Sequence, residues 1–104
     1  MYNGYTNYET WACSLYLDSI EQTQRQIYYW TIEILDSCEG DKEIASENLC
    51  DWLEDLVKDD FRPIIRGLNG FYDDMLTYSL SKIDFYNIAQ SCVESYYNDY
   101  LEEV

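Results

Sequence analysis

Apolar residues recur along this chain at the spacing of α-helices, and the clearest example covers residues 42–58. There they follow the i, i+4, i+7, i+8 rule that places side chains on one face of a helix. The opposite face of the same stretch is almost wholly acidic. The pattern predicts an amphipathic helix with this buried face: Ala45, Leu49, Trp52, Leu53, Leu56 and Val57.

Two further helices are predicted before this stretch. Thr6 followed by Glu9 has the spacing of a capping box, which indicates the start of a first helix. A second helix is expected over 22–37, ended by Gly40. The expected buried face of the first helix is Tyr8, Trp11, Ala12, Leu15 and Tyr16, and that of the second is Ile27, Trp30, Ile34 and Leu35.

Two more helices are predicted in the last third of the chain. Pro63, Gly67 and Gly70 interrupt the pattern, and a helix resumes near Phe71. Asp84 is a natural N-cap for the last helix. The expected buried residues are Tyr72, Met75, Leu76 and Leu80 in the fourth helix, and Phe85, Ile88, Ala89, Cys92, Tyr96 and Tyr100 in the fifth.

These patterns favour an all-α fold in which residues 1–104 form one compact domain of about five short helices. Glycine and proline number only four and one, so long loops are not expected. A chain of 104 residues is long enough to bury one core and too short to divide into two.

The charge is strongly one-sided, with 21 acidic residues, six basic residues and a formal net charge of −15. Direct binding to nucleic acid or to an anionic membrane is disfavoured because those surfaces are also negative. A binding partner is therefore expected to be basic. With no run of eighteen apolar residues and no signal-peptide pattern, we expect a soluble cytoplasmic protein.

The residues that usually carry chemistry are sparse. Histidine is absent, and the four cysteines form no Cys-x-x-Cys pair, so neither zinc nor another cofactor is expected. The cysteines have acidic and apolar neighbours, which disfavour a thiolate. We therefore expect no catalytic residue, no metal site and no enzymatic activity.

The acids are concentrated in residues 36–60, which hold ten acidic residues against Lys42 and Lys58. Four of them recur every four residues and would line one side of a helix, at a cost of a few tenths of a kcal/mol for each like-charged pair. We call this set the acidic ridge: Glu43, Glu47, Asp51 and Asp55. An ordinary solvated face would fit the same residues, and the sequence leaves both interpretations open.

The net charge of the chain can be compared with the charge of duplex DNA. Duplex DNA carries one charge per about 1.7 Å of axis, so fifteen charges correspond to about 25 Å of duplex. Tyrosines, of which the chain has twelve, are effective interface anchors, although many of them would also fit a core. The predicted partner-binding residues are Glu43, Glu47, Asp51, Glu54, Asp55, Asp59 and Asp60, with Tyr28, Tyr29 and Tyr97 as anchors at the rim.

The opening segment, NGYTNYETWACSLYLDS, resembles that of a family of small acidic proteins encoded by phages and other mobile elements. That family begins with Gly-Tyr-Thr-Asn-Tyr/Trp-Glu-Thr-Trp, and its closing segment is similar to residues 80–104 here. The resemblance implies a bacterial cytoplasmic setting and no catalytic residues. The matching residues are Gly4, Tyr5, Thr6, Asn7, Tyr8, Glu9, Thr10, Trp11, Leu15, Leu17 and Asp18, then Leu80, Ile83, Asp84, Phe85, Ile88 and Ala89.

Two functions remain open at this level. The first is a non-enzymatic inhibitor that imitates DNA and occupies the nucleic-acid channel of a basic host protein, such as a CRISPR nuclease, a restriction enzyme or a DNA repair enzyme. This hypothesis rests on charge and size, by analogy with known acidic phage inhibitors. The alternative is an acidic helical interaction module, or a homodimer, with a structural or adaptor role in a phage assembly.

Overall fold

The computed structural model describes residues 2–103, and within them it contains five α-helices and no strand. The predicted all-α fold is therefore confirmed. The molecule is elongated, with extents of 49 × 28 × 22 Å. The helices are α1 (Tyr8–Ser19), α2 (Glu21–Ser37), α3 (Lys42–Arg66), α4 (Gly70–Ser81) and α5 (Phe85–Glu103).

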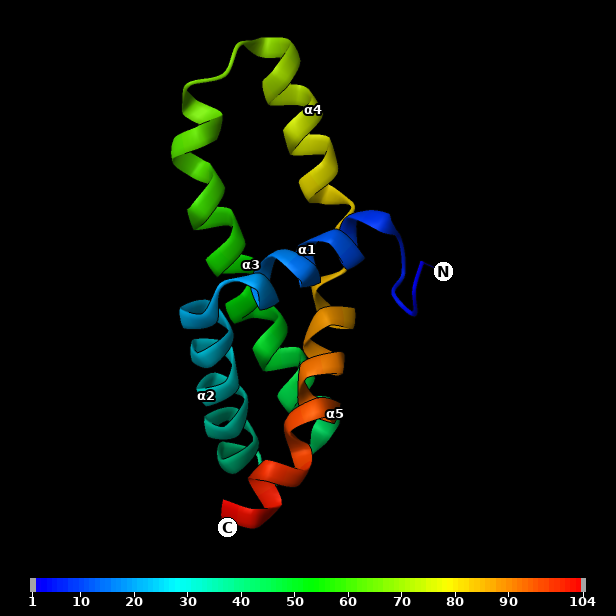
Figure 1. Ribbon diagram of the computed structural model, residues 1–104, viewed down its shortest axis with the longest axis vertical. Helices are drawn as coiled ribbons and strands as arrows, with labels where there is room; N and C mark the ends of the chain where they lie inside the picture. Colours follow the sequence, from blue (N-terminus) through cyan, green and yellow to red (C-terminus); the bar gives the residue numbers. More distant parts are fainter. Residues whose placement is uncertain (1, 104) are drawn as a thin grey trace.

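The five helices form two regions of different character (Figure 1). In the first region α2, the first part of α3 and α5 lie side by side as a bundle, and α1 lies across α2 and α5. In the second region the last part of α3 leaves the bundle and α4 returns beside it. We call the first region the bundle and the second, residues 58–82, the hairpin.

The hydrophobic core lies in the bundle. The predicted inward residues Ala45, Leu49, Leu53 and Val57 of α3 are all fully buried, as is Leu35 of α2. Trp30 and Trp52 instead pack edge to face at the margin, with ring centroids 5.3 Å apart. The remaining apolar core residues are Cys13, Leu17, Ile27, Ile34, Phe85, Ile88, Ala89, Val93 and Tyr100, while Leu56, Cys92 and Tyr96 are half-buried.

Helix α3 is longer than the pattern over 42–58 predicts, because it continues to Arg66 through Pro63. Proline has no backbone N–H, so the carbonyl of Asp59 loses its usual intrahelical donor. Around Pro63 the helix is exposed, and water can satisfy that carbonyl. Gly67 then caps the helix, its N–H donating to the carbonyls of Ile64 and Ile65.

The predicted burial of α4 is wrong. Among its residues none is buried; Tyr72 and Met75 are more than half exposed, and Leu76 and Leu80 are half-buried. The physical reason is that α4 packs sparsely on α3, beyond the end of the three-helix bundle, and has no second layer to cover it. Apolar spacing shows that a helix has an apolar side, but not that another element covers it.

The predicted orientation of α1 is also wrong. Tyr8, Leu15 and Tyr16 are exposed, and Trp11 and Ala12 are half-buried. The buried side is instead Thr10, Cys13, Ser14 and Leu17. Two of these are polar, and burial is tolerated because each hydroxyl is hydrogen-bonded: Ser14 Oγ, for example, donates to the Trp11 carbonyl at 2.8 Å.

The start of α1 differs from the predicted capping box by one residue. Asn7, and not Thr6, is the N-cap, and its side chain accepts a hydrogen bond from the Thr10 N–H at 2.9 Å. Thr6 is therefore free to donate its hydroxyl to the Asp84 carboxylate at 2.8 Å. The prediction of Asp84 as the cap of α5 agrees with the structure, since Asp84 Oδ1 accepts from the Asn87 N–H at 3.1 Å.

The opening segment of the chain and the start of α5 meet at this point. The buried hydroxyl of Thr10 accepts from the Asp84 N–H at 2.9 Å. The side chain of Asn7 donates to the Lys82 carbonyl at 2.8 Å, and the Thr6 N–H donates to Asn87 Oδ1 at 3.0 Å. We call this network the clasp. It gives the Thr-Asn-Tyr-Glu-Thr segment a structural role, because it fixes α1 to the start of α5.

Candidate partner-binding surface

The acidic ridge is a continuous exposed surface on α3. Asp41 caps the helix by accepting from the N–H groups of Glu43 and Ile44, both at 3.1 Å. Four-residue steps keep successive side chains neighbours along the helix. All four ridge residues are exposed, on the side opposite the buried Leu49 and Leu53. The structure therefore brings together the four acids that the spacing predicted.

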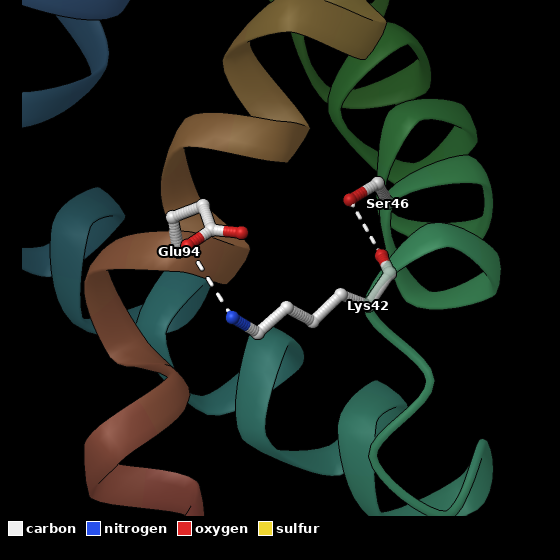
Figure 2. Close-up of polar contacts among 3 residues, drawn as sticks. All are labelled: Lys42, Ser46 and Glu94. Atoms are coloured by element: carbon white, nitrogen blue, oxygen red, sulfur yellow. Dashed lines mark hydrogen bonds and ion pairs between the residues drawn. The ribbon is translucent and has the colours of Figure 1, made fainter.

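No basic side chain neutralises the ridge within residues 2–103. Lys42, next to the ridge in sequence, extends to α5, where its ammonium lies 3.4 Å from the Glu94 carboxylate (Figure 2). The same ammonium lies 4.2 Å from the ring centroid of Tyr97. The turn that directs Lys42 is supported by Ser46, whose buried hydroxyl donates to the Lys42 carbonyl at 2.7 Å.

The other predicted acids differ from the ridge. Glu54 lies 3.5 Å from Lys58, and Asp59 lies 3.0 Å from Arg62, so both have a cation beside them. Asp60 is exposed but follows Asp51 by nine residues, or two and a half turns, which places it on the other side of α3. The seven acids are thus not one surface. Among the described residues Asp60 and the four ridge acids have no ion pair, and the four ridge acids share one side of α3.

The predicted tyrosine anchors lie elsewhere. Tyr28 is half-buried between Tyr29 and Tyr96, with ring centroids at 5.5 and 5.0 Å. Desolvation, followed by the carboxylates of Asp99 and Glu103 on α5, raises the pKa of Tyr28. These neighbours place Tyr28 at the α2–α5 surface and not beside the ridge.

The other two tyrosines have different surroundings. Tyr29 is 61% exposed and lines a hollow of about 400 Å³ with Tyr100 and acidic residues of α2 and α5. Tyr97 is half-buried under Lys42 and packs against Tyr100, so it contributes to the bundle. Of the three predicted anchors, Tyr29 alone has the exposure that an interface anchor needs.

A groove with a basic wall lies between α3 and α4, and the sequence pattern did not predict it. Lys58, Arg62 and Arg66 recur every four residues and line a hollow of about 440 Å³, together with one acidic residue, Glu54, and apolar residues that include Ile65 and Leu80. Half of the six cations of the chain are therefore on this one wall. Their spacing was a readable signal, but the predicted end of the helix at residue 58 concealed it.

The thiols of Cys13 and Cys92 are suited to packing and not to nucleophilic chemistry. Burial raises the pKa of Cys13 to about 11, and burial together with Asp18 raises the pKa of Cys92 to about 12. Both thiols therefore stay protonated at neutral pH. Within residues 2–103 no three His, Cys, Asp or Glu side chains are grouped as metal ligands, and no helix is long and apolar enough to cross a membrane.

Comparison with protein-family models, with curated proteins and with solved structures found no match for this chain. Fold and surface are therefore the basis on which a function is proposed.

Proposed function

We propose that this protein is a non-enzymatic inhibitor that imitates DNA and occupies the nucleic-acid channel of a bacterial defence nuclease, of the restriction or CRISPR type, in the host cytoplasm. The observation that carries the proposal is the acidic ridge: four exposed carboxylates, evenly spaced on one continuous helix, that form no ion pair within the described residues. A cationic channel would supply the counter-charges that the chain itself does not.

The charge density is comparable with that of DNA. From Glu43 to Asp55 the ridge rises by twelve residue steps, or about 18 Å, over which one DNA strand carries about five phosphates against four carboxylates here. On a larger scale, the net charge of −15 equals that of about 25 Å of duplex, which is comparable with the two shorter extents of the molecule, 28 and 22 Å.

The distribution of charge supports the same proposal. Residues 58–82 hold four acidic and four basic residues, whereas the rest of the chain holds 17 acidic and two basic residues. The entire net charge of −15 therefore belongs to the part of the chain outside the hairpin. Such a field speeds approach to a positive channel, and salt screens it.

Inhibition of DNA binding is the direct test. The panel is a restriction endonuclease and a CRISPR nuclease, each measured for duplex binding by mobility shift as the protein is added. We expect competitive displacement of duplex from at least one of the two enzymes, weakening steeply with salt. If both enzymes retained duplex at micromolar protein and low salt, the proposal would be contradicted.

A further inference from the structure

The side of α4 that faces neither α3 nor α1 carries an apolar stripe. Phe71, Met75 and Tyr78 recur at i, i+4 and i+7, and they are 66%, 56% and 63% exposed. Other residues of α4 face the rest of the molecule: Thr77 lines the basic groove against α3, and Leu76 lines a second hollow with α1. The stripe is therefore a separate surface that no other part of residues 2–103 covers.

A free stripe of this kind is unusual for a helix of twelve residues. Isolated helices of this length are marginal in water, and most helical stability comes from packing an apolar side. Helix α4 contacts α3 only sparsely and buries none of its residues. A partner that covered the stripe would supply the packing that α4 lacks.

Charge identifies where a second copy of this chain could approach. Two bundles with a net charge of −15 each repel one another. The hairpin is different because its four basic and four acidic residues balance. Two copies that meet through their hairpins therefore bring neutral surfaces together and keep the two acidic bundles apart.

The stripe is also flanked by opposite charges at its two ends. Asp73 and Asp74 lie in the first turns of α4, and Lys82 follows its last residue, with its ammonium 5.0 Å from the Tyr78 ring centroid. An antiparallel arrangement about a two-fold axis would set Lys82 of each copy beside the acidic end of the other, and would also align the helix dipoles favourably. We propose that α4 is the dimer interface of this protein, packing antiparallel on α4 of a second copy.

The available area is enough for a weak dimer. Large aromatic side chains bury about 150–250 Å² each when fully covered. With Tyr72 at the margin, the exposed parts of the four side chains amount to about 400–500 Å² per copy, or about 800–1,000 Å² in total. This is at the lower limit for specific interfaces, so association in the micromolar range is expected. The dimer leaves the ridge of each copy free.

Sedimentation equilibrium of the full chain from about 5 to 500 µM tests the proposal. We expect a monomer–dimer equilibrium, and we expect Met75→Glu to raise the dissociation constant at least tenfold by placing a charge in the centre of the stripe. Thr77→Glu is the matched control, with the same charge added on the same helix outside the stripe, and it should dimerise like the parent. Circular dichroism of both variants establishes that they remain folded.

The flanking charges give a second, independent measurement. Lys82→Glu and Asp74→Lys should each weaken dimerisation several-fold, and the two together should restore it, because the exchanged charges attract again across the two-fold axis. A parent that stays monomeric at 500 µM, or a Met75→Glu variant that dimerises like the parent, would overturn the proposal. Failure of the double variant to regain affinity would overturn the antiparallel arrangement.

Discussion

The bundle and the hairpin are built from similar helices but differ in what surrounds them. In the bundle α2, α3 and α5 cover one another, and the fully buried residues of the described chain lie there. In the hairpin the end of α3 and α4 meet, α1 reaches only their base, and apolar side chains such as Phe71 and Tyr78 remain exposed to water (Figure 1). The charge divides in the same way, with a strongly acidic bundle and a balanced hairpin.

This difference separates two tasks. A stiff bundle can hold carboxylates at fixed positions, which imitation of a polynucleotide requires. A loosely packed, neutral hairpin suits an apolar contact that the acidic surface would prevent. The contrast gives four measurable consequences.

The largest effect is expected from removing core volume in the bundle. Leu53 is fully buried, so Leu53→Ala should lower the free energy of unfolding by about 2–5 kcal/mol. Met75→Ala in the hairpin removes a side chain that is already more than half exposed. It should change the free energy of unfolding by less than about 0.5 kcal/mol. Urea denaturation measures both. Equal losses from the two variants would contradict the division into two regions.

Alkaline pH should destabilise the bundle through its thiols. The pKa of Cys13 and Cys92 rises from 9.0 to about 11 and about 12 on folding, so from pH 9 upward the unfolded chain loses these protons first. Stability present below pH 9 is therefore lost as the pH rises, by about 2 kcal/mol for each thiol at pH 11. Residues 58–82 contain no cysteine.

The measurement is urea denaturation at pH 8 to 11 in the parent and in a Cys13→Ala/Cys92→Ala variant. The variant should show a shallower decline, because lysines and tyrosines titrate in both proteins. An identical decline in the two proteins would mean that the buried thiols do not carry the effect.

A smaller loss is expected from the clasp. Thr10→Val keeps the size of the side chain but leaves the Asp84 N–H without its acceptor, and should cost about 1–3 kcal/mol. Thr77→Val, whose hydroxyl donates to Asp73 at an exposed position of the hairpin, is the comparison and should cost much less. Thermal unfolding of the two variants measures the difference. Equal melting temperatures would show that the clasp does not stabilise the fold.

The smallest effect has the opposite sign. Neutralising the ridge with Glu47→Gln, Asp51→Asn and Asp55→Asn relieves like-charge repulsion and should raise the free energy of unfolding by a few tenths of a kcal/mol per pair. The gain should shrink as salt increases. A loss of stability would contradict this expectation, because it would show that the ridge carboxylates stabilise the helix and do not repel one another.

The sequence predicted the five helices, the buried side of α3 and the cap of α5, because those features depend on local spacing. It did not predict which side of α1 is buried, since the buried Thr10 is satisfied by a partner 74 residues away. Apolar spacing also predicted that another helix covers each apolar stripe. The stripe of α4 shows that coverage depends on the arrangement of helices in space.

For the candidate surface, regular spacing again decided what could be predicted. The acidic ridge follows from four-residue steps along one helix. The position of Tyr97 under Lys42 does not follow from local spacing, because Lys42 reaches it from a different helix, α3. The basic groove was missed because Pro63 suggested a helix end that the exposed part of α3 does not have.

The central claim is that the ridge, and not the total charge, is what a cationic channel recognises. Its most direct test compares two variants that each remove three charges: Glu47→Gln/Asp51→Asn/Asp55→Asn on the ridge, and Glu33→Gln/Asp36→Asn/Glu102→Gln at exposed positions of α2 and α5. Affinity for an inhibited nuclease is measured at low salt by competition with duplex. We predict at least a tenfold loss for the ridge variant and a much smaller loss for the control, whereas equal affinities in the two variants would contradict the claim.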